Sequence, residues 1–319
     1  MLILNENHPQ REKLGRVTEV ITPSEADHAD IRALRLGILN LMPMMDETEN
    51  DILQSIGHSV LQIEPIWIKI ASREKSGKHT SIEHIKNFYV TMEEATKDKN
   101  LDGLIITGAP IELLDFEEVE YWEELKKIFD YTKDHIYLSM FLCWAAMAAA
   151  YHQYGIRKIK YPTKLAGVFK MKNIHGDNHY LTKGINPHLH LCNSRSTDID
   201  QLKLKELIQQ GKIIKLLESD EKPEALARQE VGITTFACPE FNAVYNLGHF
   251  EYHENTLHQE IERDKAKEIK YPIHNYYKDS ETQEIPKISW KSERTIFYGN
   301  FLNLIYSLMN QKKIPHKQF

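Results

Sequence analysis

Cys143 has the residue type and the position expected of a catalytic nucleophile. It lies where an apolar, strand-like run at 136–142 meets an alanine-rich, helix-forming segment at 144–154 that Gly155 should end. At the carboxyl end of a strand in an α/β sheet it would face the crevice in which ligands bind. The free N–H groups of a following helix would favour a thiolate and hold an oxyanion. The alternative is a small buried hydrophobe, because the glycines common around such elbows are missing.

A nucleophile needs a base, and the stretch "NLGHFEYHENT" offers His249 and Glu251. Residues two apart in a strand share a face, so both side chains can point into one site. His249 would take the thiol proton and Glu251 would steady the imidazolium. Two alternatives stay open: a core histidine beside a solvated glutamate, or a metal site that also uses His253.

Bulk composition excludes several classes of function. The 319 residues are 41% hydrophobic and 27% charged, with a net charge of −6, so nothing favours binding to nucleic acid or an anionic membrane. No apolar run reaches the ~18 residues of a membrane helix, and the N-terminus does not resemble a signal peptide. Three cysteines without a CxxC motif indicate reduced thiols in a cytoplasm, with Cys192 and Cys238 buried as structural residues.

Strands and helices alternate in the first half of the chain. Buried strands are expected at 34–41, 61–70 and 101–110, and Val119, Trp122, Leu125 and Phe129 have the spacing of one helix face within 118–135. The proline in the second strand indicates an edge or a bulge. A polar loop is expected at 71–80.

A further helix should follow the first strand, with Asp46 and Glu49 as N-cap and capping-box acid and Gly57 as terminator.

The second half is strand-rich from 164 to 250, with helices near 199–210, 254–269 and 295–310. The alternation predicts an α/β fold with a mostly parallel sheet covered by helices on both faces. Residues 1–33 should form an N-terminal arm and 34–319 a single catalytic domain.

Many segments resemble one family, the homoserine O-acyltransferases of the homoserine transsuccinylase type. They include "LGILNLMP", "ETEN", "LDGLIITGAPIELLDFEEVEYWEELKKIFDY", "FLCWAAMAAAYHQYGI", "TKLAGVF", "NSRSTD", "GHFEY" and "ISWKSERTIFYGNFLNLIY". The resemblance implies a flavodoxin-like, class I glutamine amidotransferase-like fold and a homodimer. It also implies acyl transfer from coenzyme A to an amino-acid hydroxyl through an acyl-cysteine, with no metal or prosthetic group.

Matching motifs imply a role for each site residue. Cys143 would carry the acyl group, His249 would be the general base and Glu251 would orient it. Arg263 would bind the amino-acid carboxylate, for which a bidentate guanidinium is suited, and its alternative is an ion pair with a neighbouring acid on the same helix. Lys164 and Ser194 match substrate-site positions.

Glu112 matches the position that selects the acyl donor. The resemblance implies that glutamate there accompanies acetyl-CoA, whereas glycine accompanies succinyl-CoA. The physics agrees, because a carboxylate would repel the free carboxylate of a succinyl group. A loop glutamate that faces water is the alternative.

The sequence departs from the family pattern around the expected substrate pockets. Met44 and Met45 stand where many members carry two residues that end in a lysine of the active site, and "RSTD" replaces the more usual "RYAD". These changes leave the acceptor open between L-homoserine, which we favour, and L-serine, since one methylene is worth only ~1–3 kcal/mol. The rivals of another class are a glutaminase-like hydrolase and a non-catalytic regulator.

Overall fold

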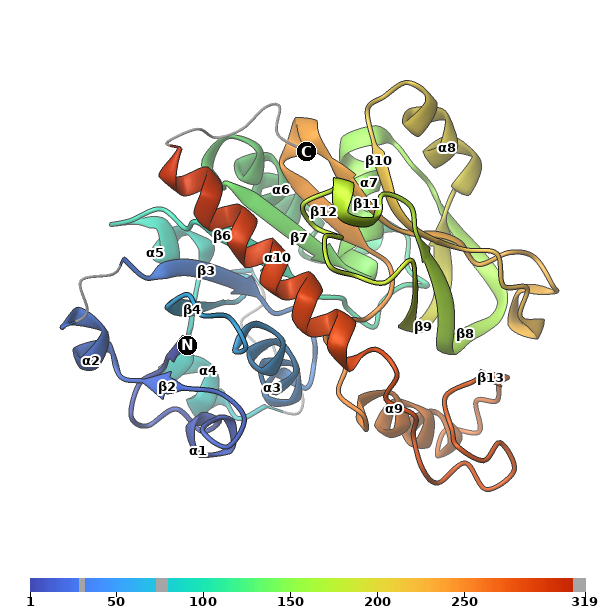
Figure 1. The fold of residues 1–319 in the computed structure, drawn as a ribbon, viewed down its shortest axis with the longest axis horizontal. Coiled ribbons are helices and arrows are strands. Elements are labelled where there is room, and N and C mark those ends of the chain that lie inside the picture. The colour runs from blue at the N-terminus through green and yellow to red at the C-terminus, as the bar shows by residue number, and fades with distance from the viewer. Residues whose placement is uncertain (29–31, 73–79, 312–319) are drawn as a thin grey trace.

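The computed structural model describes residues 1–28, 32–72 and 80–311, and within them thirteen strands form one sheet (Figure 1). Its parallel part runs in the order β2–β1–β4–β3–β6–β7–β12, and β5 adds to β4. These strands are β1 (Leu2–Ile3), β2 (Val20–Ile21), β3 (Leu34–Leu39), β4 (Ile63–Ile68), β5 (Tyr89–Val90), β6 (Gly103–Ile106), β7 (Leu138–Leu142) and β12 (Ala243–Asn246).

An antiparallel extension continues the sheet beyond β12 in the order β11–β10–β8, with β9 paired to β8. A short strand, β13, pairs parallel to β8. The extension comprises β8 (Lys158–Asn173), β9 (His188–Ile199), β10 (Ile214–Ser219), β11 (Gly232–Cys238) and β13 (Ile273–His274).

The α-helices cover both faces of the sheet, and α10 crosses one face diagonally (Figure 1). In chain order they are α1 (Arg11–Leu14), α2 (Pro23–Asp27), α3 (Met45–Ile56), α4 (Ile82–Phe88), α5 (Met92–Thr96), α6 (Trp122–His135), α7 (Trp144–Tyr154), α8 (Gln201–Gln209), α9 (Thr256–Lys265) and α10 (Lys291–Asn310). Short 3-10 helices lie at 116–118, 176–178, 224–226 and 239–241.

The buried side chains of the central strands divide between the two faces. In β7, Leu138, Met140 and Leu142 join the core beneath α3 and α10. Phe141 joins the core beneath α6 and α7 on the other face. A strand that is buried on both faces reads as a continuous apolar run, which is why the run ending at Leu142 shows no alternation.

The predicted α/β fold with helices on both faces is confirmed. The helix predicted over 118–135 begins at Trp122, so Val119 precedes it, but all four residues of the predicted face are buried: Val119, Trp122, Leu125 and Phe129. Gly155 follows α7 as its C-cap with φ of 65°, a left-handed conformation that glycine adopts freely. Strands β8 to β12 all lie largely within the range 164–250 that was predicted to be rich in strands.

The predicted cap of α3 is wrong. The helix begins at Met45 with Met44 as N-cap, and no side chain makes a capping hydrogen bond. Asp46 lies inside the first turn, and Glu49 is fully buried, where its carboxylate accepts a hydrogen bond from Tyr89. A capping pattern in the sequence does not show whether an acid in the second turn of the helix is buried, so the burial of Glu49 could not be predicted. Gly57 does end the helix.

The predicted edge or bulge in β4 is wrong, because β4 lies inside the sheet, but Pro65 stands where the pairing on one side is interrupted. On one side β4 pairs with β3 along its whole length, whereas on the other side β1 pairs only at Ile63 and β5 only at Trp67 and Ile68. Pro65 falls in the gap, where a missing N–H costs nothing. Most of the loop predicted at 71–80 lies outside the described residues.

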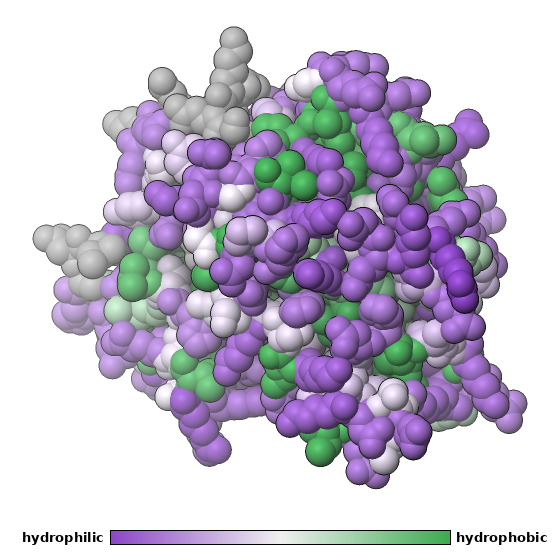
Figure 2. Space-filling model, turned by 45° about the vertical axis from the view of Figure 1, so that its right-hand side comes forward, coloured by the Kyte–Doolittle hydropathy of each residue, from purple (hydrophilic) through white to green (hydrophobic). Residues whose placement is uncertain are grey.

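The N-terminal residues contribute β1 and β2 to the sheet, and the predicted division into an arm and a catalytic domain stays a prediction. In the described part of the chain, no helix is long and apolar enough to cross a membrane. On the face shown in Figure 2, hydrophobic residues form small groups among hydrophilic ones.

Candidate active site

Cys143 occupies a sharp elbow between β7 and α7. Its backbone has φ of 49° and ψ of −112°, a conformation that is costly for a residue with a side chain. The Cys143 N–H donates to the carbonyl of Asn246, the last residue of β12, at 2.7 Å. The side chain is buried, with 8% of the residue exposed. The elbow therefore holds the thiol at the carboxyl end of β7, as the sequence predicted.

His249 reaches the elbow by a route that differs from the predicted one. Strand β12 ends at Asn246, and the chain continues as a turn in which the His249 N–H donates to the Cys192 carbonyl at 2.7 Å. Gly248 makes this approach possible, because a Cβ there would lie 2.9 Å from the same carbonyl oxygen. The prediction of a strand-like run over 249–251 is wrong, since the bridge to β9 replaces continued pairing.

Glu251 nevertheless orients His249. The Nδ1 of His249 and the Oε1 of Glu251 are 2.6 Å apart, and both side chains are buried. The imidazole also stacks on the ring of Tyr252, with centroids 4.0 Å apart. These contacts fix the ring plane and its tautomer, so that Nε2 is the atom left for proton transfer.

The charge state of His249 suits a base beside a thiolate. Burial on its own lowers the pKa of His249, but the Glu251 carboxylate and the Cys143 thiolate outweigh burial and raise it well above the usual value. The Nε2 is buried, and no nitrogen or oxygen of a described residue makes a hydrogen bond with it. The site therefore favours an imidazolium next to the Cys143 sulfur.

Gly108 and Trp144 provide backbone groups near the nucleophile. Trp144 is the first residue of α7, where an N–H has no partner within the helix. A Cβ added to Gly108 would lie 3.3 Å from the Cβ of Cys143 and 3.9 Å from the Trp144 nitrogen. A side chain at residue 108 would therefore crowd Cys143, and the glycine lets the loop after β6 lie close to the N–H groups that an oxyanion would need.

A cavity of about 310 Å³ opens beside these groups. It lies between the loops that follow β3, β6 and β12, the last residue of β7, and the helices α3 and α9. Its lining includes Gly108, Leu142, His249, Glu251 and Arg263. The volume suits a small substrate and not a macromolecule.

Arg263 lines this cavity, as expected of a substrate-binding residue. It also forms an ion pair with an acid on its own helix, which was the alternative. Its Nη2 lies 3.0 Å from Oδ1 of the neighbouring Asp264. The side chain is 40% exposed, so the pair leaves N–H groups free for a ligand. Burial tends to lower the pKa of Arg263, but the negative charges of Glu260 and Asp264 raise it.

Lys164 and Ser194 both contact the side chain of Glu260 in α9. The Lys164 Nζ lies 2.8 Å from Asp264 and 3.6 Å from Glu260, and the Ser194 hydroxyl donates to Glu260. Glu260 also accepts from the Tyr252 hydroxyl. Burial would raise the pKa of Glu260, but Lys164 and the donated hydrogen bonds lower it. Lys164 and Ser194 therefore border the cavity through Glu260, which lines it.

The alternative for Glu112, a loop side chain that faces water, does not describe its position. The Oε2 of Glu112 accepts a hydrogen bond from the Ser196 N–H at 2.8 Å, and the residue is half-buried. This contact docks the loop after β6 onto β9. The predicted role of Glu112 in donor selection stays a prediction.

The two methionines at the lysine positions point in different directions. Met44 is 38% exposed and lines the cavity, whereas Met45 is fully buried in the core beneath α3. Met45, which stands at the position of the active-site lysine, is therefore buried away from the cavity, and Met44 contributes an uncharged side chain to the cavity wall.

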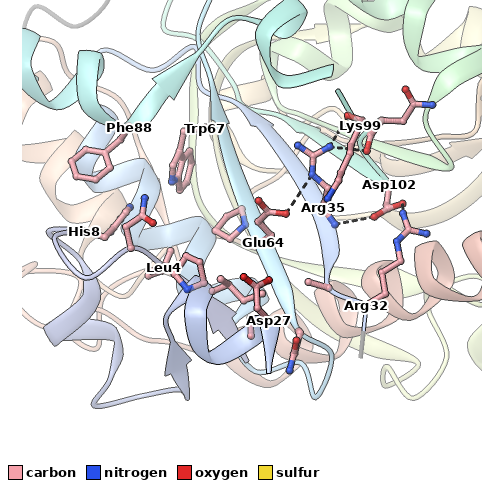
Figure 3. A pocket seen from close by; sticks show the side chains of 18 of the residues that line it. Leu4, His8, Asp27, Arg32, Arg35, Glu64, Trp67, Phe88, Lys99 and Asp102 are labelled. Carbon is pink, nitrogen blue, oxygen red and sulfur yellow. Dashed lines mark hydrogen bonds and ion pairs between the residues drawn. The ribbon is translucent and has the colours of Figure 1, made fainter. Parts of the chain in front are cut away.

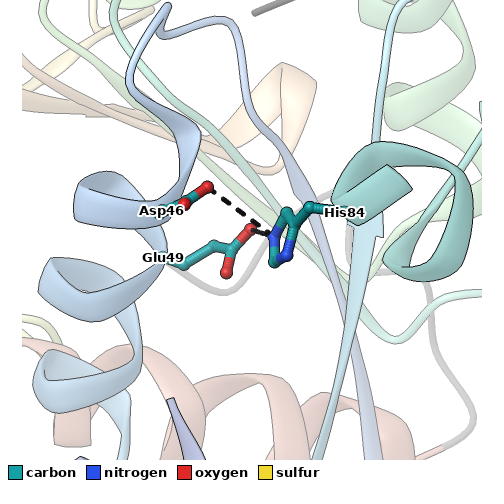
Figure 4. A group of neighbouring side chains, drawn as sticks. All are labelled: Asp46, Glu49 and His84. Carbon is teal, nitrogen blue, oxygen red and sulfur yellow. Dashed lines mark hydrogen bonds and ion pairs between the residues drawn. The ribbon is translucent and has the colours of Figure 1, made fainter. Parts of the chain in front are cut away.

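A metal at His249, Glu251 and His253 finds no support, because the described residues bring only one group of potential ligands together, and it lies elsewhere (Figure 4). That group is Asp46, Glu49 and His84, where the His84 Nε2 lies 2.7 Å from Glu49. The imidazole pairs with the two carboxylates, and these pairs link α3 to α4.

Sequence reasoning missed Tyr252, Asp51 and Gly108. Tyr252 is next to a predicted residue in "GHFEY", and Gly108 stands in the predicted turn after β6, so local signals existed for both. Asp51 is buried at the cavity wall, and burial raises its pKa to about 8 despite a hydrogen bond from Thr256. Nothing in its sequence context distinguishes it from a surface acid.

Comparison with known proteins shows the family of the chain. A family model described as homoserine O-succinyltransferase matches residues 1–311. A homoserine O-acetyltransferase of Bacillus licheniformis is 38% identical over 286 residues, which cover 89% of each chain. A homoserine O-acetyltransferase of Agathobacter rectalis is 34% identical over 307 residues, which cover 93% of each chain.

Among solved structures, a protein from Thermoplasma acidophilum described as a putative GMP synthase component is similar, with a TM-score of 0.53 and 14% identity. The match covers 88% of this chain and 99% of that chain, and it supports the predicted class I glutamine amidotransferase-like fold. Because the family model covers nearly the whole chain and these relatives match most of it, the chain belongs to the homoserine O-succinyltransferase family.

Proposed function

We propose that the protein is an acetyl-CoA-dependent O-acetyltransferase that acts on L-homoserine, a step of methionine biosynthesis. The names of the similar relatives from Bacillus licheniformis and Agathobacter rectalis support this activity. The observation that carries the proposal is the pairing of His249 with Glu251 beside the strained elbow of Cys143, which leaves Nε2 free for the thiol proton.

The first half-reaction acetylates Cys143. His249 takes the thiol proton, and the thiolate attacks the thioester carbonyl of acetyl-CoA. The N–H of Trp144 and the backbone at Gly108 stabilise the oxyanion. When the intermediate collapses, the carbon–sulfur bond to coenzyme A breaks, and the proton on His249 goes to the departing thiolate.

The second half-reaction transfers the acetyl group to the acceptor. Arg263 binds the carboxylate of L-homoserine, and His249 removes the proton of its hydroxyl as that oxygen attacks the acetyl-cysteine. The tetrahedral intermediate releases O-acetylhomoserine, and the proton on His249 remains to pair with the restored thiolate. The apolar wall around Met44 and Leu142 limits the access of water to the thioester.

The remaining parts of the proposal concern selectivity and context. Glu112 selects acetyl-CoA over succinyl-CoA, because its negative charge disfavours the succinyl carboxylate. The reaction uses no metal or prosthetic group. The protein works in the cytoplasm as a homodimer, as its family resemblance implies.

The test is CoA release by the purified protein with acetyl-CoA or succinyl-CoA, each against L-homoserine and L-serine. We expect turnover with acetyl-CoA and L-homoserine. With acetyl-CoA alone, intact-protein mass spectrometry should show one acetyl group on wild type and on Cys238→Ser, and none on Cys143→Ser. Turnover with L-serine but not L-homoserine, or cleavage of glutamine without CoA release, would contradict the proposal.

A further inference from the structure

Four carboxylates line the active-site cavity, and three of them have partners or lack a charge. Glu251 is bonded to His249, and Glu260 accepts hydrogen bonds from Ser194 and Tyr252. Asp51 accepts from Thr256, and burial raises its pKa to about 8, so that it is mostly neutral at pH 7. The carboxylates of these three acids are therefore already bonded or neutral before a substrate arrives.

Glu47 is the fourth acid. It lies in the first turn of α3, where it is exposed at the rim of the cavity that it lines. In the described part of the chain its carboxylate makes no hydrogen bond or ion pair. Partial burial and the neighbouring Asp46 raise its pKa, while Lys13 and Arg263 act in the opposite direction. Glu47 is therefore a carboxylate at a cavity wall that a cation would stabilise.

Glu47 and Arg263 face the same cavity from two different helices, α3 and α9. Each lines it, and the charge of Arg263 acts on Glu47, yet the two do not approach within the 4.0 Å of an ion pair. A zwitterionic amino acid carries an ammonium and a carboxylate on one carbon atom. Opposite charges held apart across a cavity match those two groups, and hydrogen bonds between charged partners are the strong ones.

We propose that Glu47 binds the α-ammonium group of the acceptor while Arg263 binds its α-carboxylate. This inference rests on the proposed function and adds a determinant of acceptor selectivity. With both charges bound, only the side chain of the amino acid is free to point toward His249, so its hydroxyl is presented to the acetylated Cys143. A hydroxy acid without an amino group should be a poor acceptor, because it leaves Glu47 unpaired.

The experiment measures the two half-reactions of Glu47→Gln separately. CoA release from acetyl-CoA alone reports acetylation of Cys143, and it should match wild type, which also shows that the variant folds. The kcat/KM for L-homoserine should fall roughly 10- to 100-fold, the value of one hydrogen bond between charged groups. With 4-hydroxybutanoate, which lacks the amino group, wild type and variant should have equal, low rates.

Glu83→Gln is the matched control, because Glu83 is an exposed acid in the first turn of α4 and does not line the cavity. It should behave as wild type with both acceptors. Equal kcat/KM for L-homoserine in wild type and Glu47→Gln, or an equal loss with both acceptors, would overturn the inference. If wild type itself transfers no acetyl group to L-homoserine, the proposed function fails, and the inference fails with it.

Discussion

Two cavities lie at opposite ends of the same parallel strands, and the larger one is not the catalytic candidate. The cavity of about 1060 Å³ lies where β3, β4 and β6 begin (Figure 3), whereas the cavity of about 310 Å³ lies where β7 ends. In the larger cavity four charged side chains form two ion pairs. Arg32 pairs with Asp102 at 2.7 Å and Arg35 with Glu64 at 3.3 Å.

A buried histidine in each cavity makes the same contrast. Burial, with a smaller contribution from His84, lowers the pKa of His8 in the larger cavity to about 4, so His8 is neutral at pH 7. In the smaller cavity Glu251 and Cys143 overcome burial and raise the pKa of His249. The difference teaches that chemistry follows the arrangement of charge around a side chain and not the size of the hollow.

The largest effect should come from removing the negative charge that is paired with His249. Glu251→Gln should lower kcat/KM for acetyl-CoA roughly 10²- to 10⁴-fold, as when the orienting acid of a triad is removed. It should also lower the pKa of His249, since the carboxylate is what raises it. Initial rates and an NMR titration of the imidazole measure both.

Glu254→Gln is the control for that variant, because Glu254 is an exposed acid three residues along the chain. An unchanged pKa of His249 in Glu251→Gln would show that the ion pair does not set the charge state of the base.

A methyl group at Gly108 should affect the elbow next most strongly. Gly108→Ala places a Cβ 3.3 Å from the Cβ of Cys143, close to the N–H groups that an oxyanion would need. We expect kcat to fall roughly 10- to 100-fold with little change in stability, because loss of one oxyanion donor costs about that much. Gly299→Ala in α10, where a Cβ would meet nothing within 4 Å, should leave kcat unchanged.

The raised pKa of Asp51, in the smaller cavity, predicts that the stability of the folded protein depends on pH. Its pKa is raised from 3.8 to about 8 in the folded protein, chiefly by burial. Folding therefore favours the protonated acid, and this contribution is complete below about pH 4 and is lost as the pH rises through about 8. Relative to Asp51→Asn, wild type should lose stability over this range. Urea unfolding at pH 5 and pH 8 measures the difference, and parallel changes in both proteins would refute it.

The smallest effect should come from the larger cavity. Glu64→Gln removes the partner of Arg35, but the Glu64 side chain is 45% exposed. Such a pair contributes no more than about 1 kcal/mol. We expect a small shift in urea midpoint and unchanged turnover. A large loss of activity would mean that the paired charges at the strand starts do more than stabilise the sheet.

The catalytic residues could be predicted from the sequence better than their surroundings could. Cys143 was found because a change from strand to helix periodicity marks an elbow, and His249 and Glu251 because an adjacent base and acid suit a thiol. The predicted strand over 249–251 was wrong because a backbone bond to Cys192, permitted by Gly248, is a long-range contact that leaves no local period.

The cavity wall was largely beyond prediction from sequence. Asp51 and Glu47 stand four residues apart in one helix and look alike as surface acids. One is buried beside Glu251 and the other faces Arg263, and only the packing of α3 against α9 separates them. The same limit explains why Met44 and not Met45 lines the cavity, since a shift of one residue in the start of α3 exchanges their directions.

The distance along the chain between Cys143 and His249 has a consequence for the making of the protein. During synthesis the cysteine emerges before β8 to β12 exist, and the imidazole that activates it arrives only after them. Until β12 pairs with β7, the thiol has no base and no imidazolium beside it. The newborn chain therefore lacks the paired imidazole, and the acyl-transfer chemistry of Cys143 can begin only after β12 has joined the sheet.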